Sequence, residues 1–311
     1  MNVNSRQHYL KKLVFLPLLM LTACSITPEQ PDYAALISAE QQRVEQWQNF
    51  PQQTDVAYLN DLIDTDMFDG LLQTAMKSNP SLQQTLLTLQ IRQSQLTQAS
   101  AEKRPIISSG FSALNSSGTD ASFGADLSVS WQADLWGKLA DNERAAELDI
   151  TEQNLLYQSA RDTLAAEVMQ VWLTLIAQQR AINIEQQRND SLQQTESFIL
   201  QRYRQGLGTL EDLDLARSAV ATSSASVESL TENYRQQSIQ LKTLIGQVDN
   251  PQFTLPINYP EVVIPEIDLP QQSLNRRPDL LAAYAAIQAA SARTEVAYKD
   301  LLPSLNLQAV L

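Results

Sequence analysis

Two periods of hydrophobic and polar residues occur along the chain, and each predicts a different kind of element. From Pro80 to Lys103 the leucines recur at steps of four, three and seven residues, which places them on one stripe of a helix. From Phe123 to Leu135 the odd positions are apolar or small and the even positions are polar or glycine, which predicts a strand with one apolar and one polar face. Residues 107–113 offer a weaker partner strand, and residues 115–120 predict the turn between them.

Long helices are predicted after this hairpin. No Pro or Gly occurs between Lys138 and Arg204, and 67 residues of helix at 1.5 Å each are about 100 Å long. The apolar positions of this segment, and of residues 209–246, follow a repeat of about 3.5 residues, which is typical of a coiled coil. The glycines at 206 and 208 predict a tight turn between two antiparallel helices. We expect helices 80–103 and 209–246 to stack end to end beside the longer one.

The alternating strand has two possible environments. Thirteen alternating residues at roughly 3.3 Å each extend about 43 Å, and a soluble sheet could contain such a strand. A strand that crosses a bilayer, with lipid on one side and water on the other, needs the same pattern. Because a long exposed apolar face is costly in water, the pattern favours the membrane.

An internal repeat is predicted at an offset of 198 residues. Pro80 and Pro105 are spaced like Pro278 and Pro303, and apolar and polar residues alternate again after Pro303. We therefore expect a duplication whose second copy is incomplete, since residue 311 falls within its first strand.

The N-terminus resembles a bacterial lipoprotein signal. Basic residues precede an apolar run from Leu13 to Leu21, and Leu21-Thr22-Ala23-Cys24 resembles a lipobox. On this interpretation Cys24 becomes the acylated first residue of the mature chain, and several acyl chains attach it to the membrane. The alternative is an ordinary signal peptide with an incidental cysteine.

Charge and composition exclude several classes of function. With 35 acidic and 22 basic residues the net charge is -13, so nucleic acid is not expected as a partner. The chain has a single cysteine, Cys24, and a single histidine, His8, which excludes a zinc ribbon, a Cys-His protease and a Ser-His-Asp triad. We expect no catalytic residues, no metal site and no cofactor; an envelope hydrolase would also lack a nucleophile motif.

Several motifs together resemble one known family. They are Asn275-Arg276-Arg277-Pro278-Asp279-Leu280-Leu281-Ala282-Ala283, Leu302-Pro303-Ser304-Leu305, Trp136-Gly137 after a strand, and Arg202-Tyr203 with Gly206 and Asp212. The chain resembles the outer-membrane efflux factor family, the TolC-like channels, in its lipoprotein branch. The resemblance implies a mainly α fold with a membrane β-hairpin, in which long antiparallel coiled-coil helices continue the strands of a trimeric transmembrane β-barrel. It also implies docking on a periplasmic adaptor and an inner-membrane pump, and export of small molecules.

The resemblance also implies roles for individual residues. Gly206, Leu207, Gly208 and Thr209 match the periplasmic tip that meets the adaptor, and Asp212 matches an acidic residue at the tunnel entrance. Asp212 also fits a helix capping box with Thr209, and both roles can hold. Asp126 and Asp134 fall on the polar side of the strand pattern, where they would face the barrel lumen and favour cations.

These expectations combine into one layout. It comprises a signal peptide (1–23), a lipid-anchored extended segment (24–66), a first structural repeat (67–246, with the β-hairpin at 105–135 and the long helical hairpin at 138–246), a Pro-rich linker (247–270) and the start of a second repeat (271–311). We expect an outer-membrane protein, anchored by lipid and extending into the periplasm. A lipid-anchored coiled-coil tether and a non-functional truncated product are the alternatives to an export duct.

Overall fold

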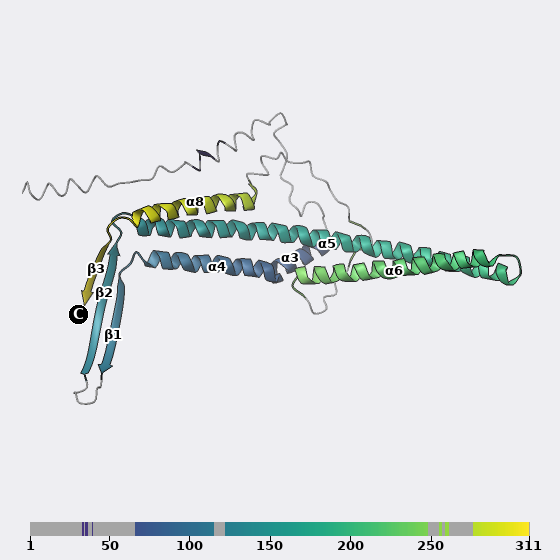
Figure 1. Cartoon of the computed structure of the whole chain (residues 1–311), viewed down its shortest axis with the longest axis horizontal. Coiled ribbons are helices and arrows are strands. Elements are labelled where there is room, and N and C mark those ends of the chain that lie inside the picture. The colour runs from purple at the N-terminus through teal and green to yellow at the C-terminus, as the bar shows by residue number, and fades with distance from the viewer. Residues whose placement is uncertain are drawn as a thin grey trace, which may run out of the picture. The chain divides into compact units, whose positions relative to one another are not determined.

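The computed structural model describes three long stretches of the chain and eight further residues (Figure 1). They are residues 66–114, 122–247 and 276–310, with Tyr33, Ala35, Leu36, Ala39, Leu255, Pro256, Tyr259 and Pro260. The signal peptide, Cys24 and nearly all of segments 24–66 and 247–270 lie outside the described residues.

Within the described stretches the fold is mainly helical, with three strands. The elements are α3 (Asp66–Ser78), α4 (Pro80–Ala101), β1 (Ile106–Leu114), β2 (Ser122–Ala133), α5 (Lys138–Arg204), α6 (Leu210–Leu244), α8 (Pro278–Lys299) and β3 (Leu305–Val310). The long helix α5 has the bounds that the absence of Pro and Gly predicts, and β2 ends two residues before the predicted strand end at Leu135.

The described residues divide into two compact units. The first contains residues 91–153 and 282–310, with the sheet, the end of α4, the start of α5 and most of α8. The second contains residues 66–90 and 154–281, with α3, the rest of α4 and the α5–α6 hairpin. Each unit is described separately below.

The core of the second unit is formed where α3, α4, α5 and α6 meet. Trp172 is fully buried, and its ring centroid lies 5.5 Å from that of Phe68 at an interplanar angle of 43°. Leu175, Leu241 and Ile245 complete this cluster with at most 1% of their surfaces exposed. Seam positions predicted from the 3.5-residue repeat, such as Leu175 and Leu241, therefore lie in the core.

Polar residues of α5 and α6 that lie between the apolar positions of the 3.5-residue repeat form hydrogen bonds with each other across the hairpin. The Ser223 hydroxyl is buried and donates to a Glu185 carboxylate oxygen at 2.6 Å. Asn189 donates its side-chain amide to the Ser224 hydroxyl at 3.1 Å. Polar pairs inside a coiled coil cost stability but fix the register of the helices. The register of α5 against α6 is thus specified by hydrogen bonds as well as by apolar contacts.

The end of α6 meets the start of α4, as the matching helix lengths predict. Asn79 donates its side-chain amide to the Leu244 carbonyl at 2.8 Å, and its side-chain oxygen accepts the Leu82 N–H at 2.8 Å. Asn79 therefore caps α4 and holds the end of α6 at the same time. Gly246 closes α6 with φ at +67°, and a Cβ there would lie 2.1 Å from the Ser78 carbonyl oxygen, so only glycine fits this junction.

In the first unit, α4 and α8 both contact the first turns of α5. Lys103, just after α4, forms an ion pair with Glu143, which also accepts the Ser100 hydroxyl hydrogen bond at 2.6 Å. The pKa of the Glu143 carboxyl is lowered, first by the Lys103 hydrogen bond and then by that of Ser100. Four buried alanines of α8 allow its backbone to approach closely: Ala282, Ala285, Ala289 and Ala292.

Candidate functional site: an apolar sheet face and a helical-hairpin tip

The three strands form one antiparallel sheet in the order β1-β2-β3. Phe111 lies opposite Ala125 and Trp131 lies opposite Leu307, so the odd positions of all three strands share one face. That face is apolar except for Ser109. Its members are Ile107, Ser109, Phe111 and Ala113 on β1, Phe123, Ala125, Leu127, Val129, Trp131 and Ala133 on β2, and Leu305, Leu307 and Ala309 on β3.

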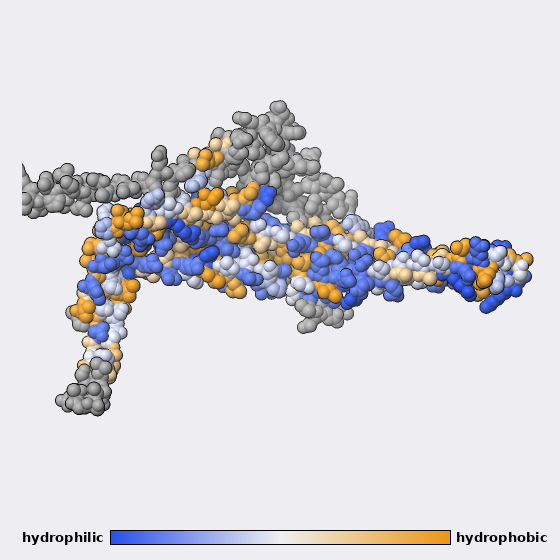
Figure 2. Space-filling model, in the orientation of Figure 1, coloured by the Kyte–Doolittle hydropathy of each residue, from blue (hydrophilic) through white to orange (hydrophobic). Residues whose placement is uncertain are grey.

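Among the described residues, most large side chains of this face are exposed. Phe111 and Phe123 are 75% and 72% exposed, and their rings stack with centroids 6.5 Å apart. Apolar side chains are visible on the surface of the sheet in Figure 2. Burying such side chains contributes about 1.5–3 kcal/mol each, so the bare face represents a large unused driving force for contact with an apolar environment.

The opposite face is mainly polar, with the apolar side chains Ile106, Leu114 and Val310 at strand ends. Asp126 lies there opposite Gly110, and Gly124 lies opposite Ser112. Gln132 of β2 pairs with Asn306 of β3 on the same face. The predicted lumen residue Asp126 is therefore exposed on the face that an aqueous lumen requires, although its role in a lumen stays a prediction.

Asp134 lies one residue beyond β2 and has a local structural contact. Its two carboxylate oxygens accept the N–H groups of Leu139 and Ala140 at 3.1 and 3.0 Å. A carboxylate at this position satisfies free N–H groups at the start of α5 and interacts favourably with the helix dipole. The strand pattern missed this capping role, because it assigned Asp134 to the strand itself.

Two tryptophans fix the bends between strands and helices. Trp131 donates its indole N–H to the Lys103 carbonyl at 3.0 Å, and Trp136 donates to the Pro303 carbonyl at 2.9 Å. Trp136 thus ties the start of α5 to the loop before β3. These bonds hold β1 and β3 on either side of β2 at their helical ends.

The tip of the helical hairpin is closed by two reinforcing motifs. Gly206 has φ at +75°, and Leu207 N–H donates to the Arg202 carbonyl at 2.9 Å, which is the Schellman pattern at the end of a helix. The Arg202 side chain donates back to the Leu207 carbonyl at 2.9 Å. The turn therefore has a defined shape and presents its apolar side chains outward. The exposed members are Phe198, Leu207, Leu210 and Leu215.

The predicted capping box at the start of α6 is confirmed. The Thr209 hydroxyl accepts the Asp212 N–H at 3.1 Å, and Asp212 accepts the Thr209 N–H at 3.3 Å and its hydroxyl hydrogen bond at 2.7 Å. These bonds from the side chain and then the backbone of Thr209 lower the pKa of the Asp212 carboxyl. The second predicted role of Asp212, at a tunnel entrance, stays a prediction.

Metal chemistry finds no support in the described stretches. They contain no group of three or more His, Cys, Asp or Glu side chains that could hold a metal ion. The helices described also include none that is both long enough and apolar enough to cross a membrane. The largest group of exposed apolar side chains described above lies on the odd-numbered face of the sheet.

The described residues thus form long helices and an antiparallel sheet with one largely exposed apolar face. The family model described as "Outer membrane efflux protein" matches residues 71–247, which is more than half of the chain. The chain belongs to this family. The match confirms the family resemblance that the sequence motifs indicate.

Individual relatives and a solved structure are similar over different lengths. The chain is 31% identical over 197 residues to the "Pyoverdine export outer membrane protein OpmQ" of Pseudomonas putida, covering 63% of this chain and 42% of OpmQ. It is 25% identical to "Outer membrane protein OprJ" of Pseudomonas aeruginosa, covering 93% of this chain and 63% of OprJ. A crystal structure of a membrane protein from Pseudomonas aeruginosa matches the fold with a TM-score of 0.73 at 23% identity, over 83% of this chain and 63% of that one. The chain thus spans less than two thirds of the length of these relatives.

Proposed function

We propose that the protein forms an outer-membrane channel of a tripartite efflux system and acts as a passive duct for small molecules. The observation that carries this proposal is the sheet with one largely exposed apolar face and one mainly polar face. Lipid on one side and water on the other would satisfy both faces at once. A tether made only of coiled coils has no use for such a sheet.

The protein is proposed to assemble as a homotrimer, which would remove the open edges of the sheet. In the described sheet β1 and β3 are the outer strands, so each has one side whose backbone groups lack a strand partner. A bilayer offers no water to these groups, and only a closed barrel leaves no edges. A twelve-stranded barrel, shared by three copies, is the closure that the family resemblance implies.

The helical hairpin is proposed to dock on a periplasmic adaptor through Gly206, Leu207, Gly208 and Thr209. Its closed turn and capping box support this role, because a rigid tip loses little conformational entropy on binding. Leu207 is 64% exposed and is available for an apolar contact. Through the adaptor the duct would receive solutes from an inner-membrane pump, with Asp212 at the tunnel entrance.

Attachment to the outer membrane is proposed to involve Cys24 as well as the barrel. Acylation of this cysteine would hold each copy at the membrane before the barrel closes. The layout of signal peptide, extended segment, repeats and linker given above belongs to the same proposal.

Single-channel recording tests the duct. The full gene product, extracted from outer membranes and reconstituted into planar bilayers, should give steady pores whose conductance scales with ion concentration. Trimers that insert into vesicles and give no pores would support the tether instead. A monomeric protein that stays in the aqueous phase after acylation would contradict both the barrel and the duct.

A further inference from the structure

The first turns of α5 carry carboxylates that are matched by cations on α8. Asp149 pairs with Arg293, and Asp141 pairs with Lys299. The Asp149 side chain is only 12% exposed, so its charge depends on this partner. A third ion pair has the reverse charges: Lys138 of α5 is the cation, and Asp300, just after α8, is the carboxylate.

The helix α4 has the same length as α8 but lacks these cations. Both helices have 22 residues, and α4 begins 198 positions before α8. At that offset Arg293 corresponds to Gln95 and Lys299 corresponds to Ala101. A neutral amide and a methyl group thus stand on α4 where α8 carries its two positive charges.

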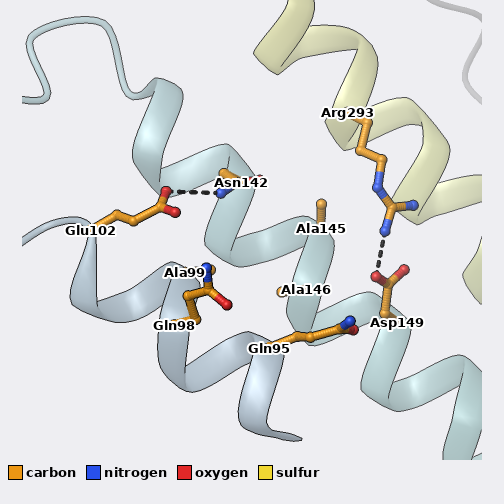
Figure 3. Close-up of a pocket in the computed structure, with 9 residues that line it drawn as sticks. All are labelled: Gln95, Gln98, Ala99, Glu102, Asn142, Ala145, Ala146, Asp149 and Arg293. Atoms are coloured by element: carbon orange, nitrogen blue, oxygen red, sulfur yellow. Dashed lines mark hydrogen bonds and ion pairs between the residues drawn. The ribbon is translucent and has the colours of Figure 1, made fainter. Parts of the chain in front are cut away.

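Arg293 and its counterpart Gln95 line the same groove on α5. Arg293 extends from α8 to Asp149, while Gln95 extends from α4 into the same groove, whose floor is formed by Ala145 and Ala146 (Figure 3). The two helices therefore contact the same stretch of α5. Only the α8 side supplies a guanidinium to the buried carboxylate.

The apolar faces of the two helices also differ in size. The buried face of α8 includes Ala285 and Ala289. At the corresponding positions α4 has Leu87 and Ile91, which are 58% and 56% exposed. The small residues let α8 approach α5 closely enough to form the ion pairs, whereas the larger residues of α4 would hold a backbone further away.

We propose that Asp141 and Asp149 of α5 are specificity residues that select α8 as the neighbour on this flank by its two cations, and that they disfavour a helix carrying the residues of α4 there. An α4 helix in that position would leave both carboxylates without cations, one of them nearly buried. Rejection of the wrong neighbour by an unpaired charge is a general means of specificity. The order of helices around an assembly is then fixed by charge as well as by shape.

Because the Asp149 carboxylate is mostly buried, removing Arg293 would leave an unpaired charge there, which is costly. The consequence for the order of copies rests on the proposed trimer. The contact between α5 and α8 within one chain does not, and it can be tested without any measurement of conduction.

Hydrogen exchange of the full-length protein in detergent micelles, read by mass spectrometry, tests the contact. The double variant Arg293→Gln with Lys299→Ala gives α8 the residues that α4 carries. We expect exchange about tenfold faster in residues 282–299 and 305–310, because charge-assisted hydrogen bonds are lost there, with no change in residues 80–101. Arg277→Gln is the matched control, since Arg277 lies just before α8 and pairs with Asp279 in the first turn of that helix, away from α5, so its loss should leave exchange unchanged.

A charge exchange separates selection from simple damage to folding. Asp141→Lys and Lys299→Asp should each accelerate exchange in α8, and the two together should restore most of the protection. Equal exchange in the double Arg293 and Lys299 variant and in the unmodified protein would overturn the proposal. So would a charge exchange whose protection is no better than that of either single variant.

Discussion

Leu127 offers a sharp test of which face of the sheet meets lipid. It lies near the middle of β2 on the apolar face, and its neighbour Ser128 lies on the polar face. Arg at position 127 would therefore project into hydrocarbon, while Arg at position 128 would project toward water. The two substitutions change the same strand by the same side chain at nearly the same depth.

The size of the effect follows from the depth of Leu127. The 12 residues of β2 extend about 40 Å at roughly 3.3 Å each, and a tilt of about 40° leaves about 30 Å along the bilayer normal. Leu127 is thus close to the midplane, where Arg on the lipid face costs about 2–4 kcal/mol. In a trimer the cost is counted three times, about 6–12 kcal/mol for one assembly. Arg at position 128 should cost well under about 1 kcal/mol, since it remains hydrated.

Reversible urea unfolding in lipid vesicles measures this difference, with folding followed by the gel mobility of unheated samples. Leu127→Arg should lower the urea midpoint strongly or prevent insertion, and Ser128→Arg should insert like the unmodified protein. Leu127→Ala, which removes apolar area without adding charge, should fall between them. Equal destabilisation by the two arginines, or a larger effect at Ser128, would refute the assignment of the faces.

Four further predictions concern the tip, the lumen and the anchor. Thr209→Ala should weaken the start of α6 by about 1 kcal/mol and speed amide exchange at the hairpin tip, while Thr209→Ser should keep its protection. The folded-state pKa of Asp212 is lowered from 3.8, so the stability that its carboxylate contributes is fully present above that pH and is lost only as pH falls below it. Amide exchange at the hairpin tip, corrected for intrinsic rates, should therefore stay constant from neutral pH down to about 4. A loss of protection at the tip near pH 6 would contradict this. Asp126→Asn should reduce the preference for cations in reversal-potential measurements without lowering the number of pores. Cys24→Ala should abolish incorporation of labelled palmitate, and continued labelling would exclude this residue as the lipid site.

The secondary structure was accessible from periodicity because its signals are local. The absence of Pro and Gly predicted α5 from Lys138 to Arg204, and the alternation of apolar and polar residues predicted the paired strands. The end-to-end contact of α6 and α4 was also predictable, since helices in one layer have to match in length. Asn79, which forms that contact, carries no signal beyond its place before Pro80.

Contacts between distant segments were harder to predict. The pairs of Asp149 with Arg293 and of Glu143 with Lys103 join residues 144 and 40 positions apart, and a charge pattern on one helix does not name its partner. The 198-residue offset between α4 and α8 shows which charged residues are particular to α8. Comparing corresponding residues shows charges on α8 that α4 lacks.

Asp134 illustrates a different limit. The alternating pattern continued through it, so the sequence predicted strand and a lumen position. The free N–H groups at the start of α5 require an acceptor, and the Asp134 carboxylate accepts hydrogen bonds from two of them. Where a strand leads directly into a helix, the last polar residue of the alternating pattern can serve as the cap of the helix and lie outside the strand.

Spin labelling of β2 tests most directly whether the sheet separates lipid from water. Single labels at each position from 123 to 133, in the protein reconstituted into vesicles, would be compared for relaxation by oxygen, which dissolves in lipid, and by a water-soluble nickel complex. The proposed channel predicts opposite alternation of the two accessibilities, with oxygen highest at odd positions such as Phe123 and Leu127 and nickel highest at even positions such as Asp126. Uniform nickel access along the whole strand, with no period of two, would contradict it.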